Sequence, residues 1–279
     1  MKKYLALLIS SLALVACSDK SSKQNADSAA PATASASANS SSIGKINPDW
    51  PTYTVGSELS YPPFQFIKDA QGGVDGFEME LLQKIAEAEK FNIQIINTPR
   101  NSSYQTLNNG ERDIWASAFS INPETEAKAE LSKPFLDFEF TIYVLDNEEN
   151  NRTLLTPASF KGKTISVSKF SKYATEAATK LTESPKNVIA SPSLFLALKE
   201  VYLKRADGVL SDSRVLAYYK LRNPEIKTRS IPLGDPPKQL VFLTKKGRKD
   251  LTAKLNHGLD KVKADGTYAK LMEKWFGEK

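Results

Sequence analysis

Short apolar segments alternate with helical patterns from about residue 50 to the end of this chain, and the alternation starts again after residue 145. Strand-like apolar patterns occupy residues 53–55, 93–96, 114–119, 138–145, 164–168, 208–210 and 240–244. Helical patterns occupy residues 77–85, 103–109, 172–182, 193–203 and 213–221, and two further helices are expected at the C-terminus. Such alternation is typical of α/β architecture. It predicts two α/β lobes, with the long strand at 138–145 crossing between them.

The chain begins with a pattern typical of an export signal. Lys2 and Lys3 precede an apolar segment at residues 4–16, and Cys17 follows the small residue Ala16. A basic start, a short apolar core and a small residue before the cleavage point characterise secretory signals. The core is shorter than the roughly 20 apolar residues that span a bilayer. Cys17 is the only cysteine, so the folded part must be stable without an intrachain disulfide.

The segment 14–17, Leu-Val-Ala-Cys, also resembles the lipobox of bacterial lipoproteins. The resemblance implies that the Cys17 thiol is acylated and that the chain is cut just before it. The alternative is an ordinary secretory signal with a cysteine there by chance. Residues 18–47 are mostly Ser, Ala, Asn and Lys, so they are expected to form a disordered tether. We expect a lipoprotein of the cell envelope that faces the periplasm or lies at the cell surface.

Charge and composition argue against several classes of protein. The formal net charge of +6 includes Lys2 and Lys3, so the mature chain is nearer +4. Its lysines are interspersed with acidic residues, whereas nucleic-acid binding usually requires a basic face. His257 is the only histidine and falls off the leucine stripe of its helix, so we expect it to be solvated. Without a cluster of Cys and His, we expect no metal, no cofactor and no histidine-based triad.

Seven motifs occur in order across nearly all of residues 50–276. They are SYPPFQF (60–66), VDGFEMEL (74–81), LNNGERDI (107–114), FSINPE (119–124), LSKPF (131–135), RADGVLSD (205–212) and ADGTYAKL (264–271). Together they resemble the extracellular solute-binding proteins of family 3, which supply polar amino acids to ABC importers. Each motif alone is a weak signal, but the ordered set is specific.

The resemblance implies a type II periplasmic-binding-protein-like fold, with a ligand cleft between two α/β lobes joined by two crossing strands. The expected divisions are a signal peptide at 1–16, the lipidated cysteine and tether at 17–47, a discontinuous first lobe at 48–142 plus 236–279, and a second lobe at 143–235. Clefts between domains are the usual sites for small ligands, and hinge closure buries the ligand. The implied partners are a small polar ligand and an ABC permease in the inner membrane, and we expect a monomer.

The resemblance also assigns residues to the cleft. Tyr61 matches an aromatic ring on one wall, and a core tyrosine is the alternative. Ser117, Ala118 and Ser120 follow a buried strand at its carboxyl end, where α/β sheets place ligands. Ser120 could instead cap the next helix. Asp212 matches an aspartate that accepts hydrogen bonds from the ligand amino group, with a helix N-cap as the alternative.

Four further positions bear on specificity. Glu58 matches a position that can carry an acid facing the ligand side chain, or it is an exposed loop acid. Ser171 follows a second-lobe strand, but Phe170 replaces the family's glycine beside it. Thr125 stands where the family has an arginine that grips the ligand α-carboxylate with two parallel hydrogen bonds. Arg100 lies near the expected cleft wall, either reaching into the cleft or lying on the surface.

The sequence therefore predicts a binding protein without catalytic activity. With Thr125 in place of arginine and with acids in the cleft, a cationic ligand fits best, because buried carboxylates without a countercharge are costly. The competing interpretation is that Arg100 has taken over the ligand carboxylate. Two other functions stay open: a cyclohexadienyl-dehydratase-like enzyme on the same fold, using Glu58 or Asp212, and a sensory or adhesive lipoprotein without transport.

Overall fold

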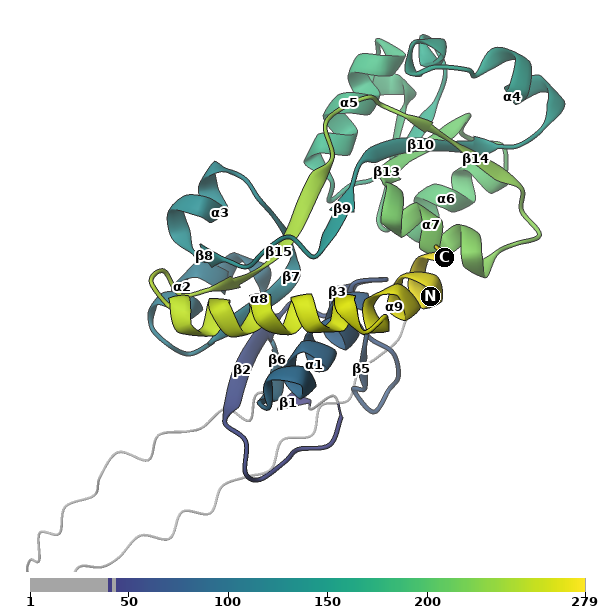
Figure 1. The fold of residues 1–279 in the computed structure, drawn as a ribbon. Helices are drawn as coiled ribbons and strands as arrows, with labels where there is room; N and C mark the ends of the chain where they lie inside the picture. Colours follow the sequence, from purple (N-terminus) through teal and green to yellow (C-terminus); the bar gives the residue numbers. More distant parts are fainter. Residues whose placement is uncertain (1–39, 42–43, 279) are drawn as a thin grey trace, which may run out of the picture. The chain divides into compact units, whose positions relative to one another are not determined.

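The computed structural model describes residues 40–41 and 44–278 (Figure 1). The chain divides into two units, Met1–Ala36 and Ser37–Lys279, and all described residues belong to the second. The predictions for the signal segment, for Cys17 and for most of the tether lie outside the described residues. In the described part, no helix is long and apolar enough to cross a membrane.

The first lobe is built on a mixed sheet in which the strand order is β1-β6-β2-β7-β15-β8, with β9 also paired to β15. Its strands are β1 (Ser40–Ser41), β2 (Thr52–Ser57), β6 (Asn92–Asn97), β7 (Ile114–Ser120), β8 (Glu130–Leu131), β9 (Leu136–Phe138) and β15 (Lys238–Thr244). The neighbours β6, β2 and β7 run parallel, and β15 runs antiparallel to β7. The carboxyl ends of three neighbouring strands therefore meet at one edge of this sheet.

Residues described before the expected start of the folded region at residue 48 already contact the first lobe. Strand β1 pairs with β6 through Ser40 and Ser41. Asn47 then exchanges hydrogen bonds with the Asn92 side chain, at 2.9 Å in each direction. These contacts attach the end of the expected tether to the first sheet.

The helices of the first lobe start and end at residues whose chemistry explains the boundary. They are α1 (Phe77–Glu89), η1 (Arg100–Ser102), α2 (Ser103–Asn108), α3 (Pro123–Lys128), α8 (Lys249–Ala264) and α9 (Thr267–Phe276). Helix α1 begins after Gly76, whose φ of 133° only glycine adopts readily. It packs its buried apolar residues against β6, β7 and α8. Helix α2 ends just before Gly110, whose φ of 80° is in the left-handed region that favours glycine.

The second lobe is built on a separate sheet in the order β12-β11-β13-β10-β14. Its strands are β10 (Phe140–Leu145), β11 (Ile165–Ser168), β12 (Val188–Ser191), β13 (Gly208–Asp212) and β14 (Thr228–Pro232). Its helices are α4 (Glu148–Thr153), η2 (Pro157–Phe160), α5 (Lys172–Thr182), η3 (Pro185–Asn187), α6 (Leu194–Tyr202) and α7 (Ser213–Arg222). Strand β11 runs parallel to both β12 and β13, so β11 and β13 end at the same edge.

The crossing between the sheets differs in one respect from the prediction of a single long strand at 138–145. Strand β9 ends at Phe138 in the first sheet, and β10 begins at Phe140 in the second. The chain thus changes sheets at Glu139, and it returns through residues 233–237 between β14 and β15. A small third sheet, β3 (Ser60–Tyr61), β4 (Gln65–Ile67) and β5 (Val74–Asp75), lies beside α1.

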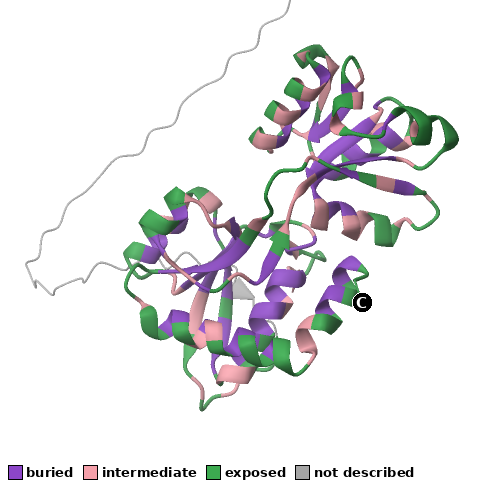
Figure 2. Cartoon of the chain, turned by 45° about the horizontal axis from the view of Figure 1, so that its top comes forward, coloured by how far each residue is buried: buried purple, intermediate pink, exposed green. Residues whose placement is uncertain are grey.

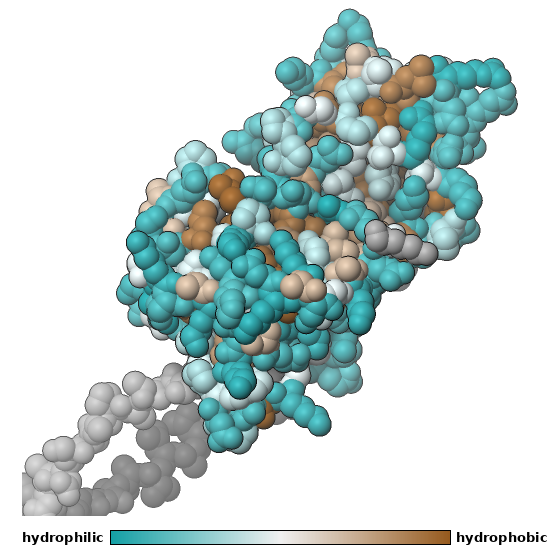
Figure 3. Space-filling view, viewed as in Figure 1, coloured by the Kyte–Doolittle hydropathy of each residue, from teal (hydrophilic) through white to brown (hydrophobic). Residues whose placement is uncertain are grey.

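Buried residues follow the strands of both sheets and the helix faces turned toward them, and exposed residues lie on the outer faces (Figure 2). The face seen in Figure 3 is mainly hydrophilic, with scattered hydrophobic residues. Helix α7 of the second lobe also packs on α9 of the first. There the rings of Tyr218 and Trp275 stack with centroids 6.1 Å apart. His257 is exposed on α8, as predicted.

Candidate ligand site

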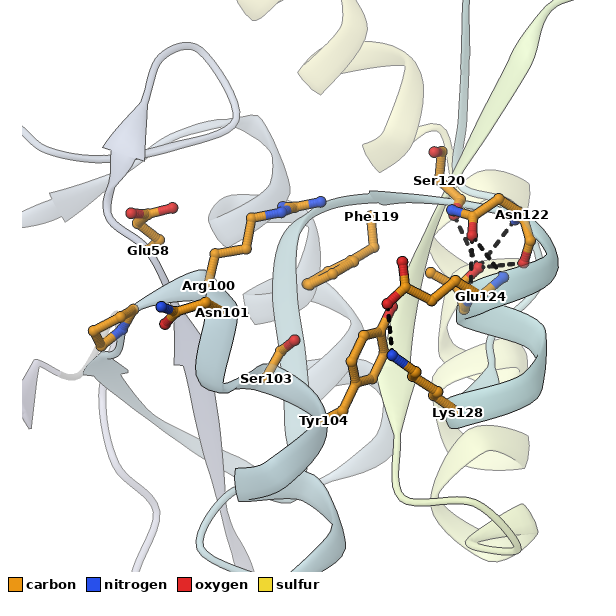
Figure 4. Close-up of a pocket in the computed structure, with 12 residues that line it drawn as sticks. Glu58, Arg100, Asn101, Ser103, Tyr104, Phe119, Ser120, Asn122, Glu124 and Lys128 are labelled. Carbon is orange, nitrogen blue, oxygen red and sulfur yellow. Dashed lines mark hydrogen bonds and ion pairs between the residues drawn. The ribbon is translucent and has the colours of Figure 1, made fainter. Parts of the chain in front are cut away.

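The carboxyl ends of β6, β2 and β7 bring three of the predicted site residues together. Arg100 follows β6, Glu58 follows β2, and Ser120 ends β7. All three line a hollow of about 720 Å³ in the first lobe (Figure 4). The other residues of its wall are Pro99, Asn101, Ser103, Tyr104, Phe119, Asn122, Glu124, Thr125 and Lys128. The site thus lies where parallel α/β strands usually place a ligand.

Arg100 is a cation held inside this hollow. Its guanidinium carbon lies 3.8 Å from the centroid of the Phe119 ring, and Nη2 donates a 3.4 Å hydrogen bond to the Ala118 carbonyl. In Figure 4 it lies between Glu58 and Phe119. Partial burial lowers the pKa of Arg100, and the acids Glu78 and Glu58 oppose this effect. Of the two placements that the sequence left open, the structure has the one inside the hollow.

Thr125 lines the same hollow but uses its hydroxyl within the protein. Helix α3 begins at the N-cap Asn122, with Pro123 as its first residue. The Thr125 hydroxyl accepts from the Asn122 backbone N–H at 3.0 Å and lies 3.1 Å from the Ser120 carbonyl oxygen. Thr125 is almost fully buried. It closes a capping box rather than offering a charged fork to a ligand. The alternative that Ser120 caps this helix is wrong.

Ser117 and Ala118 shape the end of β7. The Ser117 hydroxyl is buried and accepts from the Glu58 backbone N–H at 3.2 Å and from the Gln65 side chain at 3.3 Å. Ala118 has a φ of +50°, a left-handed conformation that is uncommon for a residue with a Cβ. The turn directs the Ala118 carbonyl to Arg100, and its N–H donates to Glu78 at 2.9 Å. These two residues therefore set the backbone beneath the hollow.

Glu78 is a buried acid that the sequence analysis did not single out. Its Oε2 accepts the Ala118 N–H, and its Oε1 is buried without a hydrogen-bond partner among the described residues. Burial raises its pKa to about 8, against the lowering effects of the Ala118 hydrogen bond and of Arg100. A signal was present, because Glu78 shares the apolar stripe of α1 with Leu82 and Ile85 at helical spacing.

This burial predicts a pH dependence of stability. Between the ordinary glutamate pKa and a pKa of about 8, the folded protein keeps a proton that the unfolded chain loses. The free energy of unfolding should therefore fall as the pH rises through this window, by up to about 1.4 kcal/mol per pH unit. Glu78→Gln keeps an oxygen for the Ala118 N–H and cannot ionise.

Urea unfolding at pH 5.5, 7 and 8 measures the effect as the difference between Glu78→Gln and wild type. We expect the variant to gain stability relative to wild type as the pH rises. Glu176→Gln, at an exposed acid on α5, is the control and should run parallel to wild type. Parallel curves for Glu78→Gln and wild type would show that the buried carboxyl does not titrate in this range.

Tyr61 belongs to the third sheet and is not a core residue, because it is 38% exposed. Its ring packs on Phe64 with centroids 5.5 Å apart. Its pKa lies far above the ordinary value, first because neighbouring protein displaces water from the hydroxyl, and then because Asp212 lies close. Arg100 acts on it in the opposite direction. Tyr61 therefore lies within electrostatic range of Asp212 from the second lobe and Arg100 from the first.

Asp212 ends β13 and is the N-cap of α7, as in the alternative that the sequence left open, while its ligand role stays a prediction. Its Oδ1 accepts from the backbone N–H of Arg214 at 2.7 Å and from that of Val215 at 3.4 Å. Burial raises its pKa to about 7 despite these bonds. Capping uses only one of the two carboxylate oxygens, so it leaves acceptor capacity for a ligand.

Ser171 is the N-cap of α5, where its hydroxyl accepts from the Ala174 N–H at 3.3 Å. It follows β11, which ends at the same edge as β13, but it does not line the hollow around Arg100. Its neighbour Phe170, in place of the family's glycine, is 78% exposed. Residues 40–41 and 44–278 contain no group of three or more His, Cys, Asp or Glu that could hold a metal ion.

Residues 53–278 match the model of a family described as bacterial extracellular solute-binding proteins, family 3. The chain belongs to this family. A probable histidine-binding protein of Neisseria gonorrhoeae is 30% identical, across all of this chain and 97% of that protein. The family resemblance drawn from the seven motifs is thus confirmed.

Solved structures agree with the fold of this family 3 protein. One titled an ancestral cationic amino acid solute binding protein has a TM-score of 0.72 at 29% identity, over 81% of this chain and 95% of that one. The L-cystine solute receptor of Neisseria gonorrhoeae, in its unliganded open conformation, has a TM-score of 0.68 at 25% identity, over 82% and 94%. The predicted type II two-lobed α/β fold is confirmed.

Proposed function

We propose that this family 3 protein captures a small amino acid between its lobes and delivers it to an ABC permease. The observation that carries the proposal is the position of Tyr61 and Asp212. They come from different lobes, yet Tyr61 lies within electrostatic range of both Asp212 and Arg100. An amino acid can be bound by an aromatic wall beside its side chain, an anionic acceptor for its ammonium group and a cation for its carboxylate. The relatives described as binding histidine, cationic amino acids and cystine support this ligand class.

Isothermal titration calorimetry of the purified chain with L-histidine, L-arginine, L-lysine and L-cystine tests the proposal. We expect one-site binding of at least one of them with a Kd of about 1 μM or below, equivalent to about −8 kcal/mol. Native mass spectrometry of the freshly purified protein complements the titration by detecting a ligand retained from the cell. No binding of any of these or of the other standard amino acids would contradict the proposal.

Among these ligands, the acids of the site favour one with a cationic side chain. Glu58 lines the hollow, the buried Glu78 lies within electrostatic range of Arg100, and the buried Asp212 lies within electrostatic range of Tyr61. A second positive charge on the ligand would be attracted to the exposed Glu58 carboxylate and would favour ionisation of Glu78 and Asp212, whose pKa values burial raises to about 8 and about 7. We therefore expect arginine, lysine or histidine to bind more tightly than glutamine in the same titration.

The protein is proposed to perform no chemistry on its ligand. The rival enzyme function has one specific observation in its favour, since the buried acids Glu78 and Asp212 have pKa values near 8 and 7 and could donate or accept a proton at neutral pH. Incubation with prephenate or arogenate distinguishes the two functions. Formation of the aromatic product above the rate without protein would support the enzyme, and no product is expected.

We further propose that Cys17 is acylated and anchors the protein at the cell envelope. The lipobox-like segment 14–17 supports this proposal. Cys17→Ala should move the protein from the membrane fraction to the soluble fraction, because a lipid chain contributes about 0.8 kcal/mol per buried CH₂ to membrane binding. Fractionation followed by intact mass measurement checks both location and lipid. A wild-type mass without lipid would contradict the anchor.

A further inference from the structure

We propose that Arg100 binds the α-carboxylate of the ligand, in place of the arginine that this family 3 protein lacks at Thr125. This inference rests on the proposed capture of an amino acid. It deepens that function by assigning the group that recognises the carboxylate.

Residues 100 and 125 lie in the wall of the same hollow. Thr125 and Arg100 both line it, from α3 and η1 respectively. Thr125 carries no charge and its hydroxyl is committed to the capping box. The Lys128 ammonium, which also lines the hollow from α3, is paired with Glu124 at 2.7 Å. The Arg100 guanidinium, which follows β6, can serve a ligand in the same hollow.

The Arg100 guanidinium has unused hydrogen-bond donors. A guanidinium carries five N–H donors. In the described part of the chain, Arg100 makes one long hydrogen bond, at 3.4 Å to the Ala118 carbonyl, and no ion pair. Burial of a cation with so few partners is costly, and its lowered pKa reflects that cost. A carboxylate would supply both the missing acceptors and the missing countercharge.

The Arg100 guanidinium is held in place over the Phe119 ring before any ligand binds. It lies over the Phe119 ring, which itself makes an edge contact with Trp115 and a tilted contact with Tyr104, with ring centroids 6.1 Å and 6.2 Å apart. Stacking occupies the face of the guanidinium and leaves its N–H edges available. A planar fork held in this way favours a carboxylate, which accepts two parallel hydrogen bonds.

The nearby acids Glu78 and Glu58 do not form an ion pair with Arg100 in the described residues. Glu78 is bonded to the Ala118 N–H, and Glu58 lines the hollow without forming an ion pair with Arg100 in the described residues. They act on Arg100 only through space. The fork therefore stays available to a ligand.

The test compares the tightest-binding amino acid of the calorimetric panel with its α-carboxamide, which lacks the negative charge. Wild type, Arg100→Ala and Arg100→Gln are titrated with both compounds. Arg100→Gln keeps a polar side chain near Phe119 but cannot form the fork. We expect wild type to prefer the acid over the amide at least about thirtyfold, because loss of one partner of a buried charged hydrogen bond costs that much or more. In both variants the amino acid should bind at least about thirtyfold more weakly than it binds wild type. The affinities of each variant for the acid and for the amide should then differ by no more than about threefold.

Arg222→Ala is the matched control. Its guanidinium also stacks on an aromatic ring, 3.7 Å from the Tyr218 centroid, but on α7 and outside the hollow. It should bind the acid and the amide as wild type does. Retention of the wild-type preference for the acid by folded Arg100→Ala or Arg100→Gln would overturn the assignment and leave the proposed function intact. If wild type binds no amino acid, both fall together.

Discussion

Asp212→Asn is expected to lower the affinity for the bound amino acid at least about thirtyfold while leaving the fold intact. Asparagine caps helices as well as aspartate does, so the bond to the Arg214 N–H is kept. Only the negative charge that would hold the ligand ammonium is removed, and such a loss costs about 2–5 kcal/mol. Calorimetry gives the affinity, and thermal unfolding checks the fold.

The same variant tests the pH dependence of binding. Because the pKa of Asp212 is about 7 in the unliganded protein and an ammonium group favours the ionised form, wild-type affinity should fall as the pH drops from 8 to 5. Asp212→Asn should lose that component. Asp207→Asn, just before the opposite end of the same strand, is the control, since among the described residues its carboxylate accepts the Thr164 N–H alone. Unchanged affinity in Asp212→Asn would remove Asp212 from the site.

Gly76→Ala is expected to destabilise the protein by about 3 kcal/mol or more. The φ of Gly76 is 133°, and a Cβ built there would lie 2.2 Å from the Phe64 carbonyl oxygen. The strain of this backbone region adds about 1–3 kcal/mol to that clash. Since Gly76 starts the helix that carries Glu78, the change should also weaken ligand binding.

Gly110→Ala is the matched control for this change. Gly110 also has a positive φ, but the space around its missing Cβ is open. We expect it to cost only about 1 kcal/mol, as left-handed conformations do for residues with a Cβ. Equal losses for the two variants in urea unfolding would show that the close approach to Phe64 has little effect.

The sequence predicts most of the central elements but not the edges of the second sheet. Helix α5 was expected at 172–182 and spans Lys172–Thr182, because its apolar stripe follows a good N-cap. Strands β12 and β14 were not expected. Both are edge strands with partly exposed residues, so their apolar periodicity is weak. Edge pairing depends on neighbours distant in sequence, which a local pattern does not record.

The site shows the same limit. The departure at Thr125 is visible in the sequence, because it is a change of residue type within a motif. The placement of Arg100 inside the hollow is not visible in the sequence, because it depends on the contact of its guanidinium with Phe119 of β7. Glu78 was overlooked although its place on an apolar helix stripe could have marked it. A role that depends on three-dimensional proximity needs the structure even where, as for Glu78, the residue lies within an ordered motif.

The most direct test of the account is a crystal structure of the protein with the amino acid that binds most tightly. We expect the ligand to lie between Tyr61 and Asp212, with its ammonium group bound to Asp212. Its carboxylate should accept two hydrogen bonds from Arg100 at about 2.7–2.9 Å, the range of charge-assisted pairs. A ligand outside this cleft, or a carboxylate held by other groups with Arg100 turned away, would contradict it.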